Sequence, residues 1–329
     1  MRLTLFPSTP AMPPRHPPSV EYALFSPRGS PKSIMSQNPP SAPDESIRRL
    51  TDQWLAAGVL ASKDHRHTME STNSTASKWL QIYRGTEPDR DSCGELNEQL
   101  PRLVIADVQT AGRGRLGRSW DAQNDGLAFS LVINGCHELL SIAVGVAIAE
   151  AIEHLAAPTN CGLKWPNDVW MGGIKVAGTL TERVDVASMN DTHNPNDTHN
   201  PNNPNDCAAS PIAIIGIGIN VGSSPTLEAA QATSVNQATG RAFSRWELLC
   251  ELIPLLIHNA QHCQTDRADL LNSFRNRCVL TGQMIRCTID GEPITGRCEG
   301  IDDRGEMRVQ TESALRICRS GEVSRVRKV

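Results

Sequence analysis

A segment rich in glycine and arginine, residues 112–120 (GRGRLGRSW), limits what this chain can form more than any other stretch. One strand-like run, residues 103–108 (LVIADV), precedes it, and a second, residues 127–133 (LAFSLVI), follows it. Glycine lets the backbone approach a ligand closely, and arginine presents a planar fork of donors that suits phosphate or carboxylate. The segment therefore predicts a loop between two strands that holds an anionic ligand.

The same segment is open to other interpretations. Gly112, Gly114 and Gly117 satisfy the G-x-G-x-x-G fingerprint of dinucleotide-binding folds, but that fingerprint requires a helix to begin at the last glycine. Residues 119–126 are rich in turn formers and a strand-like run follows, which disfavours a Rossmann fold. No G-K-[ST] follows the glycines, which excludes a P-loop. Taken alone, the segment is equally consistent with a solvated hairpin, and it also resembles an RNA-binding stretch.

Composition restricts the class of protein. The 329 residues, of which 39% are hydrophobic, suffice for one large domain and an appendage. A net charge of −4 provides no overall basic field to attract nucleic acid. The ten cysteines include no C-x-x-C pair, which argues against a zinc site or a disulfide framework and favours a reducing cytoplasm. The longest apolar run, near residues 140–150, is too short to span a bilayer.

Two stretches lack the composition of a folded core. Residues 1–43 hold half of the 22 prolines, mixed with serine, and are predicted to be a disordered leader. Residues 189–206 contain the hexapeptide NDTHNP twice, which predicts a solvated, asparagine-rich repeat loop between two hairpin strands. The chain is therefore predicted to contain the leader, a large domain over residues 44–279 and a small domain over residues 280–329.

Periodicity predicts the main helices and strands. Helices are expected at residues 44–60, 74–82, 139–156, 234–239, 245–264 and 269–279. Further strands are expected at residues 161–169, 174–184 and 210–221, and the short alternating strands from Gly282 onward indicate a small β-barrel. Residues 84–99 are expected to form a surface loop, and His65 and His67 are expected to be solvated rather than to bind a metal.

Four further motifs accompany the Gly/Arg segment in a fixed order. They are ESTN at residues 70–73, KWPND at residues 164–168, GIKVAG at residues 173–178 and GIGINV at residues 216–221. In this order the series closely resembles biotin protein ligase, the enzyme that attaches biotin to a lysine of a carrier protein. The resemblance extends from about Met69 to the C-terminus.

The resemblance implies a fold and a reaction. The fold is α/β (α+β): a mixed β-sheet flanked by helices, like class II aminoacyl-tRNA synthetases and biotin ligases, followed by a small SH3-like β-barrel. The reaction uses ATP, biotin and Mg²⁺ to make biotinyl-5′-AMP, and then transfers biotin to the carrier. The biotin carboxylate is already a nucleophile, so the residues need to align reactants and neutralise charge.

The resemblance also assigns roles to residues. Catalytic charges are expected from Arg115, Arg118 and Lys175. Biotin is expected to contact Ser71, Thr72, Asn73, Gln109, Gly112, Arg113, Gly114, Arg115 and Lys175. ATP or the adenylate is expected to contact Arg115, Arg118, Trp120, Lys164, Asn167, Asp168 and Asn220, with Mg²⁺ at Asp168. From the residues alone, Asn167 and Asp168 are equally consistent with a tight turn, and Lys175 with a solvated strand end.

The expected partner is the biotin carboxyl carrier protein domain of acetyl-CoA carboxylase or of a related biotin-dependent enzyme. We expect a cytoplasmic monomer or homodimer that binds neither nucleic acid nor membrane. Some biotin ligases carry an N-terminal winged helix that binds DNA, but one amphipathic helix at residues 44–60 is too little for that domain. The alternatives are a lipoate–protein ligase, which works by the same logic, and a biotin-sensing regulator without enzymatic activity.

Overall fold

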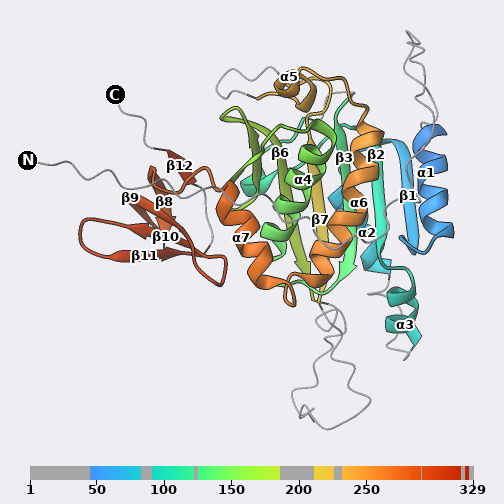
Figure 1. The fold of residues 1–329 in the computed structure, drawn as a ribbon. Helices are drawn as coiled ribbons and strands as arrows, with labels where there is room; N and C mark the ends of the chain where they lie inside the picture. Colours follow the sequence, from blue (N-terminus) through green and yellow to red (C-terminus); the bar gives the residue numbers. More distant parts are fainter. Residues whose placement is uncertain are drawn as a thin grey trace, which may run out of the picture. The chain divides into compact units, whose positions relative to one another are not determined.

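Seven strands form one sheet in the order β1-β2-β3-β7-β6-β5-β4 (Figure 1). The computed structural model describes residues 45–82, 91–121, 125–185, 211–225, 232–289, 291–319 and 323–325. The predicted leader at residues 1–43 and the repeat loop at residues 189–206 lie outside these ranges. The strands are β1 (Ser62–Met69), β2 (Arg102–Gln109), β3 (Leu127–Asn134), β4 (Gly162–Lys164), β5 (Asp168–Met171), β6 (Ile174–Val184) and β7 (Ile212–Ile219). β1 and β2 are parallel and the other neighbours are antiparallel, which confirms the predicted mixed sheet.

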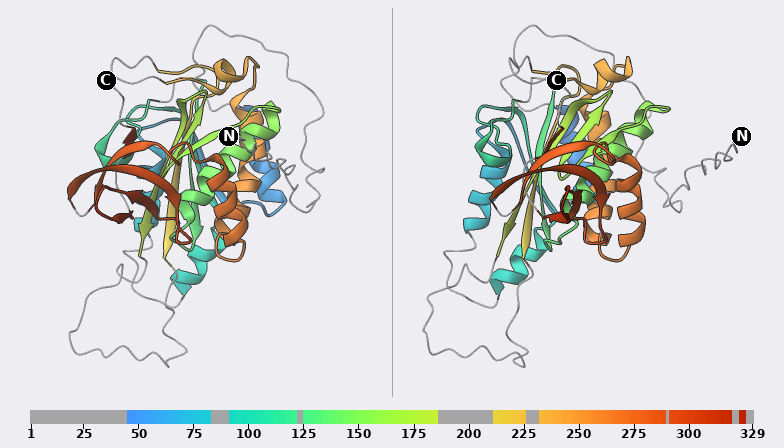
Figure 2. Two further views of the ribbon diagram at one scale, coloured as in Figure 1. Left: turned by 60° about the vertical axis from the view of Figure 1, so that its left-hand side comes forward. Right: turned by 90° about the vertical axis from the view of Figure 1, so that its left-hand side faces the viewer.

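Helices cover both faces of this sheet (Figure 2). One face carries α1 (Glu45–Ala56), α4 (Leu140–Ala156), α6 (Arg245–His262) and α7 (Arg267–Arg277). The other carries α2 (Thr72–Ile82) and α3 (Asp91–Glu98), while the short α5 (Val235–Thr239) follows β7. Within the described ranges, no helix combines the length and apolar composition that a membrane crossing requires.

The central strands are apolar along their whole length because both of their faces are covered. All eight residues of β7 and seven of the eight in β3 are buried. Their side chains alternate between a large core under α4 and α6 and a smaller core under α2 and α3. The continuous apolar runs of the sequence are therefore strands between two layers of helices.

One row of small residues crosses the α2 side of the sheet. Gly178 on β6 pairs with Gly218 on β7, Gly218 pairs with Ala128 on β3, and Ala128 pairs with Ala106 on β2. Residues paired across strands point to the same face. These four positions therefore leave a strip of sheet without side chains large enough to fill the space above it.

A second, smaller sheet follows α7. It contains β8 (Met284–Ile289), β9 (Glu292–Ile301), β10 (Met307–Gln310), β11 (Leu315–Cys318) and β12 (Val323–Arg325) in the antiparallel order β11-β10-β9-β8-β12. Inward residues alternate with exposed ones, as in β8. The indole Nε1 of Trp165 donates to the carbonyl oxygen of Gly305, 2.9 Å away, which links this sheet to the KWPND turn.

The structure corrects two expectations. Residues 91–98 of the predicted surface loop form α3, because Leu96 is buried in the core beneath α2; residues 83–90 lie outside the described ranges. The side chain of His65 is only 5% exposed, and that of His67 is 24% exposed, so the pair is not a fully solvated one. They lie on β1 beside the buried Asp107 of β2, which the parallel pairing of these strands brings next to them.

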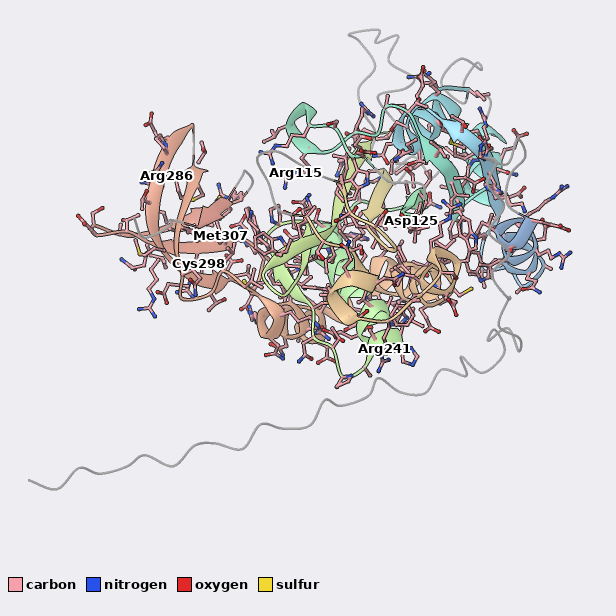
Figure 3. The ribbon with its side chains drawn as sticks, turned by 90° about the horizontal axis from the view of Figure 1, so that it is seen from above. Arg115, Asp125, Arg241, Arg286, Cys298 and Met307 are labelled. Atoms are coloured by element: carbon pink, nitrogen blue, oxygen red, sulfur yellow. The ribbon has the colours of Figure 1, made fainter. Side chains whose placement is uncertain are left out.

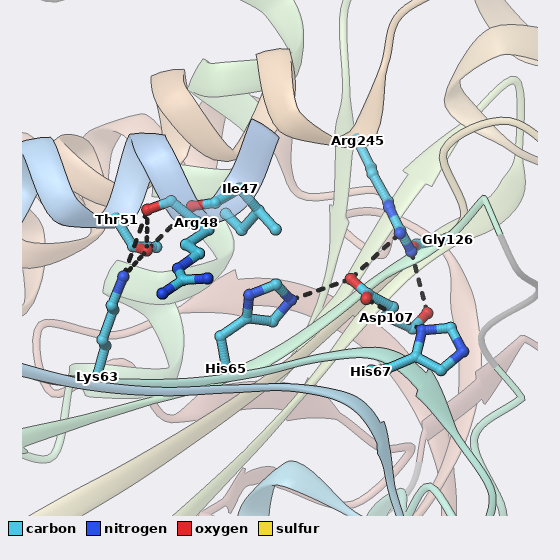
Figure 4. A network of polar contacts seen from close by, with 9 residues as sticks. All are labelled: Ile47, Arg48, Thr51, Lys63, His65, His67, Asp107, Gly126 and Arg245. Carbon is cyan, nitrogen blue, oxygen red and sulfur yellow. Dashed lines mark hydrogen bonds and ion pairs between the residues drawn. The ribbon is translucent and has the colours of Figure 1, made fainter. Parts of the chain in front are cut away.

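Asp107 is the centre of a buried polar cluster between β1, β2 and α6 (Figure 4). Its carboxylate lies 3.2 Å from His65 Nε2, 3.3 Å from His67 Nδ1 and 3.4 Å from Arg245 Nη2. Arg245 also donates to the backbone carbonyls of Asp107 and Gly126. Burial alone would raise the pKa of Asp107, but the His65 hydrogen bond and the Arg245 charge outweigh it and hold the pKa below its usual value. The cluster joins the end of β2 to the start of β3.

Replacing Asp107 with asparagine is expected to lower the free energy of unfolding by about 2 kcal/mol at neutral pH, because a buried charged partner is lost. Because the pKa of Asp107 is lowered in the folded state, its carboxylate stabilises the fold fully at pH values above its ordinary pKa of 3.8. This stabilisation is lost as the pH falls through the lower pKa of the folded state. Urea unfolding should therefore give the same deficit at pH 7 and pH 5 and a smaller one below about pH 4. Asp303→Asn, at a carboxylate that is 93% exposed, is the control; a deficit that disappears between pH 7 and pH 5 would contradict the account.

Candidate active site

Two residues of this strip, Gly178 and Gly218, form the floor of a cavity on the α2 side of the sheet. The cavity encloses about 930 Å³, part of it open to solvent. Beside the strip, Asn73 at the start of α2 lies against Gly216, where an added Cβ would collide with its side chain. Close packing of the α2 N-terminus on the sheet thus requires glycine at this point in β7.

The Gly/Arg segment folds as a tight hairpin beside this cavity, and Arg115 is labelled in it in Figure 3. The amide of Trp120 donates to the carbonyl of Gly112 at 2.8 Å, and the amide of Gly114 donates to the carbonyl of Arg118 at 2.7 Å. The turn at its tip places Leu116 at φ 57° and Gly117 at φ 72°. The hairpin interpretation and the ligand-loop interpretation are therefore compatible.

Trp120 lies on the glycines of the cavity floor. An added Cβ on Gly218 would collide with the indole, and one on Gly178 would lie 3.3 Å from it. The Lys175 ammonium lies 5.5 Å from the ring centroid, within the range of a cation–π contact. The indole Nε1 is buried, and no described residue accepts its hydrogen bond. The Trp120 indole can therefore lie on the floor only because Gly178 and Gly218 carry no side chains.

Positive charge is concentrated on one wall of the cavity. Lys175, near the start of β6, lies 2.7 Å from Asp168 Oδ1 at the start of β5. Arg115 reaches from the loop to Asn167, with Nη1 3.3 Å from Oδ1. Lys164 lines the same wall and lies 5.2 Å from the Trp170 ring centroid. The KWPND turn and Arg115 of the loop thus meet at this wall, where an anionic ligand would find several cations.

Another part of the cavity lining is a network of hydroxyl and amide groups around the start of α2. Ser71 caps the helix by accepting from the amide of Ser74 at 3.4 Å. The amide of Thr72 donates to Gln109 Oε1 at 2.8 Å. Ser130 Oγ lies 2.8 Å from Thr72 Oγ1 and 2.6 Å from Asn73 Oδ1. Ser71 and Thr72 belong to this wall, so helix capping and ligand contact are compatible here as well.

The structure gathers nearly all of the predicted site residues around one cavity. Those that line it are Ser71, Thr72, Asn73, Gln109, Arg113, Gly114, Arg115, Arg118, Trp120, Lys164, Asn167, Asp168 and Lys175. Gly112 lies at the base of the loop, where a Cβ would collide with the carbonyl of Trp120. Asn220 is buried and donates to the carbonyl of Thr233 at 3.1 Å. Neither of these two lines the cavity, and the individual roles of all these residues remain predictions.

Two family models match the chain. The Biotin/lipoate A/B protein ligase family model covers residues 87–193, and the Biotin protein ligase C terminal domain model covers residues 281–326. The first range contains the Gly/Arg loop and the charged wall, and the second contains the small sheet. The chain belongs to the biotin protein ligase family. It is an enzyme of this ligase class, and protein biotinylation is the activity that the family name describes.

Relatives of the ligase agree with this assignment. It is 28% identical over 235 residues to the biotin–[acetyl-CoA-carboxylase] ligase of Mycobacterium tuberculosis, covering 68% of this chain and 79% of that protein. It is 28% identical over 232 residues to the bifunctional ligase/repressor BirA of Bacillus subtilis, covering 67% and 65%. The Aquifex aeolicus biotin protein ligase, solved with biotin and ATP, has a TM-score of 0.59, 24% identity and coverage of 81% and 99%. This last likeness shows that the fold is shared.

Alanine at the two floor glycines of the ligase should have different effects. Gly216→Ala is expected to reduce the free energy of unfolding by roughly 1–3 kcal/mol, because Asn73 is held by buried hydrogen bonds and cannot move aside. Gly218→Ala should leave stability nearly unchanged and displace Trp120, which lies on a loop. Trypsin, which cleaves after arginine, should then cut the loop faster in Gly218→Ala than in wild type. Thermal unfolding and timed proteolysis check this; equal proteolysis of the two variants at equal stability would contradict it.

Proposed function

We propose that the protein is an ATP-dependent biotin protein ligase that forms biotinyl-5′-AMP and then transfers biotin to a lysine of a biotin carboxyl carrier protein domain. The supporting observation is the division of one cavity into a neutral polar wall and a cationic wall. The neutral wall suits the cyclic urea of biotin, and the cationic wall suits carboxylate and phosphate. Biotin bound with its urea at the neutral wall would place its carboxylate at the cationic wall. The phosphates of ATP would bind at the same wall, next to that carboxylate.

In the first step the biotin carboxylate attacks the α-phosphorus of ATP, and pyrophosphate leaves. Lys175, Arg115 and Arg118 stabilise the charge that develops on the phosphate, because cations fixed in place before reaction need no reorganisation. The Asp168 contact holds the Lys175 ammonium at the wall. No general base is required, since the nucleophile is already ionised.

Magnesium fits this wall through Asp168. No described residues form a group of three or more His, Cys, Asp or Glu side chains that could hold a metal. A single carboxylate together with substrate phosphates is a set that Mg²⁺ commonly takes. When bound with ATP, magnesium would neutralise phosphate charge.

In the second step the carrier lysine amine attacks the carbonyl carbon of the mixed anhydride, and AMP leaves. Until then the anhydride must be kept from water. The Gly/Arg loop, with Trp120 on the cavity floor, provides this cover. Asn220 directly follows the last residue of β7 and is buried, and we propose that it supports the adenylate side of the site.

Finer features of the assignment belong to the same proposal. We propose domains over residues 44–279 and 280–329, with the first of the class II synthetase type and the second an SH3-like barrel. Closure of that barrel is supported by the 3.7 Å contact between Cys318 Sγ on β11 and the Thr288 carbonyl on β8. The eight cysteines whose side chains are described are free thiols, which suits a cytoplasmic location. Acetyl-CoA carboxylase is the proposed source of the carrier domain, and the ligase acts as a monomer or homodimer.

One labelling experiment tests the function. The full chain is incubated with ATP, magnesium, labelled biotin or labelled lipoate, and an apo carrier domain. We expect labelled carrier with biotin and none with lipoate. Labelling with lipoate would favour the lipoate ligase. Adenylate formation without any carrier labelling would favour the biotin-sensing regulator.

A further inference from the structure

We propose that Glu182 and Ser130 are positioning residues that fix the hydrogen-bond polarity of the cavity wall at Thr72 and Gln109. The inference rests on the proposed function, because the ligand concerned is the cyclic urea of biotin. Neither Glu182 nor Ser130 belongs to the motifs that carry the family resemblance. Both lie on the α2 side of the sheet, on β6 and β3, with Asn73 between them.

The orientation of the Asn73 amide is determined by β6. Its Nδ2 lies 2.7 Å from Glu182 Oε2 and 3.3 Å from the carbonyl oxygen of Leu180. A carboxylate and a carbonyl oxygen can only accept hydrogen bonds. The amide nitrogen must therefore face β6, and the amide oxygen must face β3.

This orientation determines the proton of Ser130. Asn73 Oδ1 can only accept, so Ser130 donates its single hydroxyl proton to it across 2.6 Å. Thr72 Oγ1 lies 2.8 Å from Ser130 Oγ, on the accepting side of that contact, and donates its own proton to Gln109 Oε1 at 3.3 Å. The Thr72 proton is thus used within the protein, and its oxygen faces the cavity as an acceptor.

The orientation of Gln109 is determined in the same way. The backbone N–H of Thr72 donates to Gln109 Oε1 at 2.8 Å, so the oxygen of this amide points to α2. The amide nitrogen lies on the other side, next to Gly112 at the base of the loop. The wall therefore offers an acceptor at Thr72 and a donor at Gln109. This pair complements the N–H and C=O groups of a urea, and the dithiolane ring of lipoate has neither group.

Burial makes this polarity hard to reverse. Ser130 is fully buried, and Thr72 and Asn73 are each 3% exposed. Reversing any bond in the chain would leave a buried donor or acceptor without a partner. A rival role for Glu182 is purely electrostatic, because its Oε1 lies 3.6 Å from Arg113 Nη2 in the loop.

Four single variants and one double variant of the full-length protein separate these roles. Ser130→Ala and Glu182→Leu each remove one link of the series of hydrogen bonds. Glu182→Gln keeps an acceptor for Asn73 without the charge, and Thr181→Val alters the other side of the same strand. Binding of biotin, dethiobiotin and ATP is measured by calorimetry, together with thermal unfolding. Dethiobiotin keeps the cyclic urea and lacks the sulfur ring, so it reports on the urea contact alone.

We expect Ser130→Ala and Glu182→Leu each to weaken biotin and dethiobiotin binding about tenfold, with ATP binding unchanged. Glu182→Gln and Thr181→Val should stay within about twofold of wild type, and the Ser130→Ala/Glu182→Leu double variant should lose little more than either single one. Such non-additivity would indicate that Ser130 and Glu182 act through one connected series of hydrogen bonds.

Other results would overturn the inference. Equal weakening in Glu182→Gln and Glu182→Leu with normal Ser130→Ala would assign Glu182 to the Arg113 charge contact. Parallel losses of biotin binding, ATP binding and thermal midpoint would indicate a structural role only. A wild-type protein that binds ATP and neither urea ligand would overturn the proposed function itself. This result is obtained without any of the variants, so the two failures can be told apart.

Discussion

Lys175→Ala is expected to slow pyrophosphate release on the order of a hundredfold, a typical effect of removing one charge contact to a transition state. The ammonium lies on the cationic wall, 2.7 Å from Asp168 Oδ1. Removing it also leaves the Asp168 carboxylate facing anionic reactants without its counter-charge. Both effects act on adenylation, and the fold should remain intact because the Lys175 side chain is 35% exposed.

A coupled pyrophosphate assay and a thermal scan measure these effects. Lys78→Ala, at a surface lysine that is 73% exposed, should behave as wild type. Full activity with an unchanged thermal midpoint in Lys175→Ala would return this residue to the solvated strand end that the sequence also allows.

Arg115→Gly is expected to release biotinyl-5′-AMP into solution rather than to abolish its formation. The guanidinium links the loop to Asn167 at 3.3 Å, and charge-assisted contacts of this kind contribute roughly 1.5–3 kcal/mol. Glycine also raises the conformational entropy of the open loop by about 1 kcal/mol. The mixed anhydride should then escape before transfer. Free biotinyl-5′-AMP and labelling of bystander lysines are the expected signs.

The measurement is streptavidin detection in a mixture of the carrier and an unrelated lysine-rich protein. Arg115→Ala is the matched variant, since it removes the guanidinium without the extra backbone freedom of glycine. Leakage in Arg115→Gly that exceeds that in Arg115→Ala would assign part of the effect to loop entropy. Labelling confined to the carrier in both variants would show that loop closure does not depend on Arg115. Loss of all adenylate would show that the first step cannot proceed without Arg115 and would contradict its role in retaining the anhydride.

Much of the site was predictable because its residues lie in short motifs at the ends of strands. The KWPND turn lies between β4 and β5, and Lys175 lies near the start of β6. Apolar runs such as residues 127–133 and 210–221 are long enough to identify the central strands. Motif order then indicated that these strand ends meet, and the cavity lining confirms that they do.

The remaining features depend on register and on strand pairing, which local patterns do not contain. Ser130 stands within an apolar run, and only its pairing with Gly216 shows that it lies beneath α2. Glu182 resembles an ordinary solvated strand residue until Asn73 is placed beside it. The parallel β1–β2 pair explains the failure at His65, because Asp107 is distant in sequence and adjacent in space.

The cavity lies at one end of the β6–β7 hairpin, and the long connection between these two strands lies at the other end. Gly178 and Gly218 lie at its cavity end, while Val184 and Ile212 pair at its other end, about 20 Å away along the strand. Everything between residues 184 and 212 leaves and re-enters the sheet at two adjacent points, so its length places no demand on the floor. An inserted reporter domain, or new chain ends made by circular permutation, would meet the same tolerance there.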